Sequence, residues 1–179
     1  MFVALVPWYM GWYLNSFSPL WWIVLPLAAG IAFLFARRAR GEATWFEWAP
    51  PACFAVLAGL FLAVPGFTAG RGGALCNLMI GVLWGASLVA GQPVTQLYSR
   101  NNYSAAITGS ALFRRINGIL TGFWVILFLA EAAIGLSVST AAPGTLSIIL
   151  GLAMIPALAF TAMFPKHYVA RFARKGGPR

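Results

Sequence analysis

The chain has 179 residues, of which 61% are hydrophobic and only 8% are charged, and its formal net charge at pH 7 is +9. A soluble domain carries roughly a quarter of its residues as charged side chains. The composition therefore excludes a water-soluble globular domain and indicates a protein whose solvent is lipid. The basic residues punctuate the apolar runs instead of forming one arm or patch, which argues against nucleic-acid binding.

The first segment, Met1 to Asn15, is apolar and aromatic but too short to span a bilayer comfortably, and Pro7 interrupts it. We interpret it as an interfacial or re-entrant segment, and a sixth, short span is the alternative. The interfacial interpretation places four aromatic side chains at headgroup depth, namely Trp8, Tyr9, Trp12 and Tyr13.

Five further segments approach the ~20 apolar residues that a spanning helix needs. The sequence therefore predicts an all-α fold, a polytopic transmembrane helical bundle of five spans, or six if the first segment also crosses. The length suits one integral membrane domain, 1–179. Its predicted spans cover residues 19–36, 50–64, 73–91, 116–138 and 146–164, and a basic tail follows at 165–179.

The distribution of lysine and arginine predicts the orientation of these spans, because basic residues concentrate on the cytoplasmic side. All but one of the twelve basic residues fall after the first, third and fifth spans, and only Arg71 falls on the other side. The C-terminus is therefore expected in the cytoplasm. The eleven are Arg37, Arg38, Arg40, Arg100, Arg114, Arg115, Lys166, Arg171, Arg174, Lys175 and Arg179.

Small residues recur at a spacing of four in three of the spans, which favours close approach of helix backbones. The strips are Ala55/Gly59/Ala63, Gly81/Gly85 and Gly118/Gly122.

The fourth span carries a mixed polar and aromatic stripe. Its members follow spacings of four, three, four and three, which place them on one helix face: Asn117, Thr121, Trp124, Phe128 and Glu131. A carboxylate at membrane depth is costly and needs a partner, a cavity or water. Glu131 is therefore a candidate proton or cation site, and the alternative is that it reaches water near the outer end of the span.

A second candidate region is the corner at which the third span ends. Pro93 is followed by Thr95, Gln96, Tyr98 and Arg100, a set of hydrogen-bonding side chains that suits a shaped cytoplasmic corner or a re-entrant mouth. The alternative is a helix end with a headgroup-anchoring tyrosine and arginine. Asn77 is the other polar residue at membrane depth.

The residues that would bind metals or perform acid-base catalysis are nearly absent. His167 is the only histidine, aspartate does not occur, and the two cysteines lack a CxxC spacing. We therefore expect no metal site, no cofactor and no enzymatic activity.

The pattern of Pro93, Thr95, Gln96, Tyr98 and Arg100, then Phe113, Asn117, Thr121 and Trp124, resembles intracellular septation protein A and related small bacterial inner-membrane proteins. The chain departs from that pattern at Gln92, where relatives often have a basic residue, and at Asn101, where several have an acidic one. The resemblance implies a multi-pass protein of the bacterial inner membrane linked to envelope synthesis or division. It supplies no established catalytic residues.

Two functions remain open at this stage. The first is an envelope-linked or division-linked interaction protein, or a subunit of a membrane complex. The second is a transporter or channel for a small solute or ion that uses the polar stripe of the fourth span. The expected partners are anionic lipid headgroups at the cytoplasmic face and another membrane protein or a second copy of the chain, with no nucleic acid.

Overall fold

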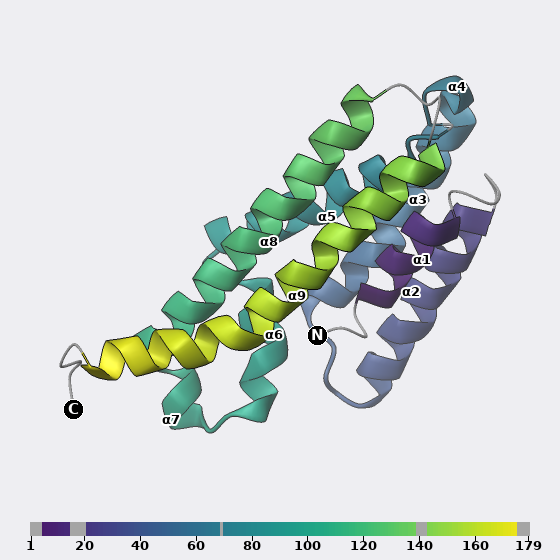
Figure 1. Ribbon diagram of the computed structural model, residues 1–179. Helices are drawn as coiled ribbons and strands as arrows, with labels where there is room; N and C mark the ends of the chain where they lie inside the picture. Colours follow the sequence, from purple (N-terminus) through teal and green to yellow (C-terminus); the bar gives the residue numbers. More distant parts are fainter. Residues whose placement is uncertain (1–4, 15–20, 69, 139–142, 175–179) are drawn as a thin grey trace.

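A computed structural model describes residues 5–14, 21–68, 70–138 and 143–174, and every regular element in these ranges is a helix (Figure 1). The long helices run side by side as a bundle. In chain order the elements are α1 (Val6–Leu14), α2 (Trp21–Ala39), η2 (Trp45–Trp48), α3 (Ala49–Ala63), α4 (Pro65–Thr68), α5 (Gly72–Val89), α6 (Val94–Ser99), η3 (Arg100–Asn102), α7 (Ala105–Thr108), α8 (Ala111–Ser137) and α9 (Pro143–Arg174).

Four helical segments in the described ranges are long and apolar enough to cross a membrane: α2, the continuous η2–α3 segment, α5 and α8. The chain is thus a helical membrane protein, as the composition predicts. The fifth predicted span, 146–164, lies within α9, and the count of five or six spans stays a prediction.

Two helices extend well beyond the predicted spans that they contain. Helix α8 begins at Ala111 instead of 116, because the Ser110 hydroxyl caps it by accepting a hydrogen bond from the Phe113 N–H at 3.1 Å. The first part of the predicted basic tail is helical, since α9 continues to Arg174, and residues 175–179 lie outside the described ranges. The C-terminal part of α9, which contains Pro165, turns away from the direction of its first part (Figure 1).

Helices α5 and α8 form the central pair, and two glycines allow their close approach. A Cβ atom at Gly81 would lie 2.8 Å from Leu129 Cδ2, and one at Gly135 would lie 2.8 Å from the Ala74 Cβ. Two glycines of the other predicted strips lie in no such close contact. A Cβ at Gly118 or Gly59 would meet nothing within 4 Å, because these positions face away from neighbouring helices.

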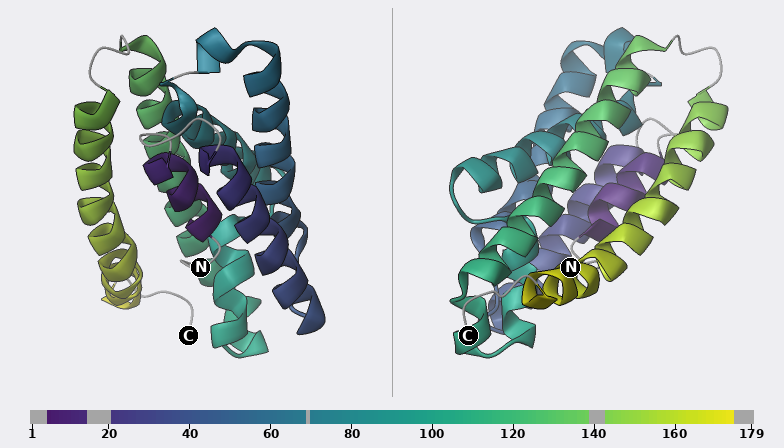
Figure 2. Two further views of the ribbon diagram at one scale, coloured as in Figure 1. Left: turned by 90° about the vertical axis from the view of Figure 1, so that its right-hand side faces the viewer. Right: turned by 60° about the vertical axis from the view of Figure 1, so that its left-hand side comes forward.

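Helix α1 packs inside the bundle, against α2 and α5, and not on its surface (Figure 2). Trp8 is 0% exposed and its ring lies 5.4 Å from that of Phe54, while Trp12 packs against Phe128. Trp8 and Trp12 therefore pack against protein, and their depth in the membrane stays a prediction. A nine-residue helix is only about 13.5 Å long, and its apolar surface is buried here by protein. The Tyr13 side chain and residues 1–4 and 15 lie outside what the structure describes.

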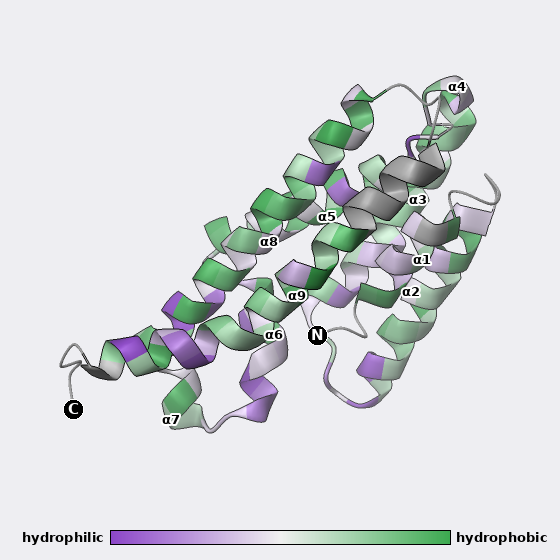
Figure 3. Ribbon diagram, viewed as in Figure 1, coloured by the Kyte–Doolittle hydropathy of each residue, from purple (hydrophilic) through white to green (hydrophobic). Residues whose placement is uncertain are grey.

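The basic segments gather at one end of the bundle. The C-terminal end of α2, the α6–α7 region, the start of α8 and the end of α9 lie at that end, while α4 lies at the other (Figure 1). Hydrophilic ribbon is concentrated on α6, the lower part of α8 and the lower part of α9 (Figure 3). We call this the basic end.

Candidate functional site

The corner at Pro93 is built by a helix terminus and a new short helix. Gly91, with φ +69°, ends α5: its N–H donates to Leu88 O at 3.0 Å, and the next N–H, of Gln92, donates to Ser87 O at 2.9 Å. Pro93 then precedes α6 as its N-terminal cap residue. The Ser87 hydroxyl accepts a hydrogen bond from the Val94 N–H at 3.3 Å, which ties the start of α6 to the end of α5.

Buried hydrogen bonds attach α6 to α8. The Thr95 hydroxyl donates to Asn117 O at 2.8 Å and lies 2.8 Å from the Thr121 hydroxyl. The Ser99 hydroxyl donates to Asn117 Oδ1 at 3.1 Å, and Asn117 Nδ2 donates to Phe113 O at 2.9 Å. Asn117 and Thr121, the first two residues of the predicted stripe, therefore both have hydrogen-bond partners. The bonds from Thr95 and Ser99 fix the position of α6 against α8.

A cavity of about 340 Å³ lies between α6, η3, α8 and α9, and we call it the polar pocket. All but one of its lining residues carry a hydroxyl or an amide, and none is charged. The lining residues are Thr95, Tyr98, Ser99, Asn102, Asn117, Leu120 and Thr161. The structure thus gathers Tyr98 and Asn117 from the predicted set around one pocket.

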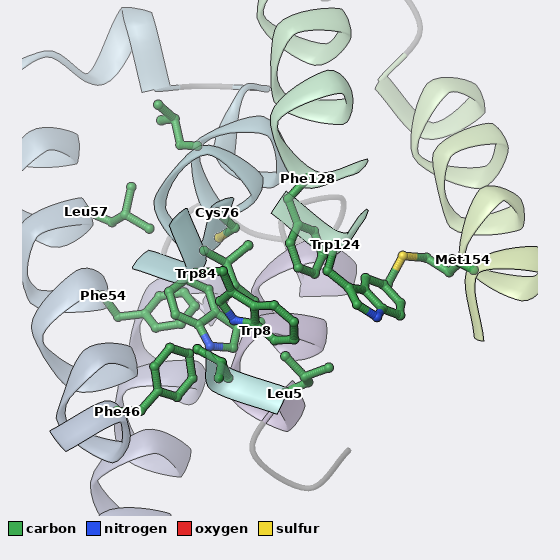
Figure 4. Close-up of a cluster of buried hydrophobic side chains, with 14 of the residues drawn as sticks. Leu5, Trp8, Phe46, Phe54, Leu57, Cys76, Trp84, Trp124, Phe128 and Met154 are labelled. Carbon is green, nitrogen blue, oxygen red and sulfur yellow. The ribbon is translucent and has the colours of Figure 1, made fainter. Parts of the chain in front are cut away.

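An aromatic layer closes the bundle beyond the pocket. Trp84, Trp124 and Phe128 are each fully buried, and their ring centroids lie 5.4–6.2 Å apart (Figure 4). Trp124 Nε1 donates to the Thr161 hydroxyl at 3.0 Å, which joins α8 to α9. Met154 reaches toward Trp124 from α9 (Figure 4). The stripe is therefore interrupted by packed rings between Thr121 and Glu131.

Glu131 lies on the far side of the aromatic layer and is 4% exposed. The side-chain amide of Asn77, on α5, is next to its carboxylate, and Tyr9 of α1 is nearby. Within the described residues, Glu131 Oε1 and Asn77 Oδ1 have no hydrogen-bond partner. The sequence left open whether Glu131 reaches water or faces the bundle, and the structure places it inside. A buried carboxylate oxygen and a neighbouring amide oxygen that both lack a partner suit a proton or a small cation.

The remaining predicted residues lie outside these two clusters. Arg100 is exposed at the start of η3. Gln96 is half-buried, and its Oε1 has no hydrogen-bond partner in the described part of the chain. Pro93 acts through the backbone, by starting α6.

Sequence patterns alone did not lead us to a buried ionic cluster at the basic end. Glu47 is 0% exposed; its Oε2 accepts from the Thr44 N–H at 2.6 Å, and its Oε1 lies 3.4 Å from Arg37 Nε. Arg37 also pairs with Glu42 at 2.6 Å, and its guanidinium lies 5.9 Å from the centre of the Tyr98 ring. A signal was present in the sequence, because Thr44 and Glu47 have the spacing of a capping box, and they form one.

This cluster changes the chemistry of Tyr98, whose ring packs against Phe46 at 6.1 Å. Burial raises the pKa of the Tyr98 hydroxyl above its usual range, and the neighbouring Glu47 carboxylate raises it further, while Arg37 opposes the shift. Tyr98 is therefore neutral at physiological pH. It forms a wall shared by the ionic cluster and the polar pocket.

The chain matches no protein-family model, no curated protein and no solved structure. The resemblance to intracellular septation protein A therefore rests only on the nine residues from Pro93 to Trp124 that carry it. Five of these residues lie together in the structure. Thr95, Tyr98, Asn117 and Thr121 build the α6–α8 junction and its pocket, and Trp124 seals it.

Proposed function

We propose that this protein is an interaction protein of the bacterial inner membrane, a subunit of an envelope-linked or division-linked complex. Its partner docks on the corner formed by residues 94–108, which we call the α6–α7 corner. The observation that carries the proposal is the fixed attachment of this corner to α8 by the Thr95 and Ser99 hydrogen bonds. A pre-positioned surface loses little conformational entropy on binding.

The outward side of the α6–α7 corner has the composition of a protein-binding surface. Tyr103 is 54% exposed and Ile107 is 48% exposed, and Arg100 is exposed beside them in the chain. Tyrosine and arginine are enriched among the residues that dominate binding energy at interfaces. Arg114 and Arg115 begin the next helix, so the surrounding charge favours a partner with an acidic cytoplasmic segment.

Site-specific photo-crosslinking in native membranes tests this proposal. A photoreactive residue at Tyr103 or Ile107 is expected to capture one reproducible protein, whereas one at Ile126, an exposed position of the apolar α8, is expected to label lipid. Arg100→Glu should abolish the capture by reversing the charge that attracts the partner. Lipid labelling at all three positions, or capture that is unchanged by Arg100→Glu, would argue against the proposal.

Proton or ion conduction is the second candidate, and the buried carboxylate of Glu131 is the observation that favours it. The aromatic layer stands between Glu131 and the polar pocket, so this candidate needs those rings to move. Flux in proteoliposomes that is abolished by Glu131→Gln would support conduction. An absence of flux from the wild-type protein across a broad solute screen would remove it.

A further inference from the structure

Glu131 and Asn77 lie in a tightly packed section of the central helix pair. Gly81 follows Asn77 by one turn of α5, and a Cβ atom there would crowd α8. Gly135 follows Glu131 by one turn of α8, and a Cβ atom there would lie 2.8 Å from the Ala74 Cβ of α5. These two contacts stand on either side of the acid and the amide. Glu131 is only 4% exposed and Asn77 only 5%, so protein and not solvent surrounds both groups.

One oxygen atom of each group lacks a hydrogen-bond partner among the described residues. The two atoms are Glu131 Oε1 and Asn77 Oδ1, and the Asn77 amide is next to the Glu131 carboxyl group. An ionised carboxylate only accepts hydrogen bonds, whereas a protonated one carries an O–H that donates. A single proton on Glu131 therefore satisfies both atoms, because the carboxyl O–H can donate to the amide oxygen.

The helices around Glu131 supply no partner of positive charge in the described part of the chain. Both ion pairs found there lie at the basic end, and Arg71, at the start of α5, donates to the backbone of α4. The nearby titratable groups are neutral ones, the Tyr9 hydroxyl of α1 and the Cys76 thiol of α5. Helix α9 has no titratable residue before Lys166, and α8 has no other after its first two turns. An ionised Glu131 would thus be a buried charge without compensation.

A metal ion fits this site less well than a proton does. Calcium and magnesium ions take about six or more oxygen ligands. The site offers the oxygens of Glu131 and Asn77 and the nearby Tyr9 hydroxyl, and the buried ring of Phe128 lies one turn before Glu131. A proton needs only one donor atom and one acceptor atom, and the acid and the amide provide them.

We propose that Glu131 binds a proton and is a neutral carboxylic acid at pH 7, with its O–H donated to Asn77 Oδ1. The bound proton depends neither on docking at the α6–α7 corner nor on conduction. It also names the ion of the second candidate function, and this one assignment rests on that candidate: the ion conducted is a proton. Absence of flux would remove conduction and leave the proton site intact.

The three acidic residues of the chain are all glutamates, so the charge state of each can be observed. In protein labelled with ¹³C at the glutamate carboxyl carbon, each residue gives one NMR resonance, whose chemical shift distinguishes acid from carboxylate. The spectrum is recorded in dodecyl maltoside at pH 7, and Glu131→Gln identifies the Glu131 resonance. Glu47 is the internal control, because it is equally buried but pairs with Arg37. Glu131 is expected at the acid position, and Glu47 at the carboxylate position.

The salt in the buffer separates a proton from a metal ion. The Glu131 resonance should stay at the acid position when sodium or potassium chloride replaces choline chloride. A carboxylate resonance for Glu131 in all three salts would overturn the proposal. A resonance that moves to the carboxylate position only with sodium or potassium would also overturn it, and would identify a bound cation instead.

The hydrogen bond to Asn77 is tested by Asn77→Leu, which removes the acceptor, with Asn101→Leu at an exposed position as the control. Infrared spectra in dodecyl maltoside, a detergent without a carbonyl group, report the C=O stretch of the Glu131 acid. This band should move to higher frequency in Asn77→Leu, because the acid loses its hydrogen-bonded neighbour, and should not move in Asn101→Leu. Thermal unfolding verifies that both variants fold. The same frequency in both variants would show that Asn77 is not the partner of the acid.

Discussion

The polar residues at the two ends of the buried stripe on α8 differ in their hydrogen bonding. Asn117 and Thr121, at the basic end, have hydrogen-bond partners on their own helix or on α6. Glu131, at the other end, keeps one carboxylate oxygen without a partner in the described part of the chain, beside the equally unpartnered Asn77 Oδ1. Polar residues on one face of the same helix thus lie in two different environments. The first environment fixes structure and shapes a pocket, whereas the second leaves an acid free to take up a proton or cation.

The largest effect is expected from removing the aromatic layer between the two ends of the stripe. Trp124→Ala is expected to lower the free energy of unfolding by about 3–5 kcal/mol, because it leaves a large cavity in a fully buried aromatic cluster. Trp124→Phe keeps a ring and loses the hydrogen bond to Thr161, so about 1 kcal/mol is expected. Reversible unfolding in mixed micelles measures both changes. Equal losses from the two variants would mean that the hydrogen bond, and not the packing, holds the layer.

Removing a satisfied polar group at the basic end should have the next largest effect. Thr95→Val keeps the side-chain shape but leaves Asn117 O and the Thr121 hydroxyl without their buried partner, at a cost of about 1–3 kcal/mol. Thr108→Val is the control, since the Thr108 hydroxyl is exposed and bonds within its own turn. The same unfolding assay applies. A loss no greater than that of the control would show that α6 is held to α8 by other contacts.

The opposite sign is expected at the other end of the stripe. Glu131→Gln replaces an acid that has no basic partner among the described residues with a neutral residue of similar shape, so stability should stay the same or rise by roughly 1–2 kcal/mol. Unfolding at neutral pH is the measurement. A clear destabilisation would reveal a partner for the carboxylate and would make the two ends of the stripe alike.

The helix face that carries the stripe could be predicted from the sequence, because a period of 3.6 residues is a local property. It predicted that the five residues of the α8 stripe share one helix face, and in the structure all five are buried. The apolar runs likewise predicted the four long helices. Which residues bond to the stripe could not be predicted, since Ser99 and Thr161 reach it from other helices and only the folded chain brings them together.

Two features of the fold depend on tertiary contacts that local sequence patterns do not reveal. Helix α1 is apolar on all sides, so no periodicity distinguishes packing inside the bundle from lying at a membrane surface. Glu47 stands between aromatic residues, and Thr44 and Arg37 allow it to be buried completely. In both cases a tertiary contact decided the outcome.

The smallest expected effect concerns Tyr98, where the basic end meets the ionic cluster. Its pKa is raised in the folded protein, so the stability contributed by the neutral hydroxyl is fully present below the unfolded pKa of about 10 and is lost as pH rises above it. Tyr98→Phe removes this loss. Between pH 8 and pH 10.5 the wild-type protein should lose about 0.5–1 kcal/mol more than Tyr98→Phe. Tyr103→Phe, at an exposed position, should follow the wild type. Parallel pH profiles for the wild type and Tyr98→Phe would mean that Tyr98 ionises as freely when folded as when unfolded, and that the Glu47 carboxylate does not act on it.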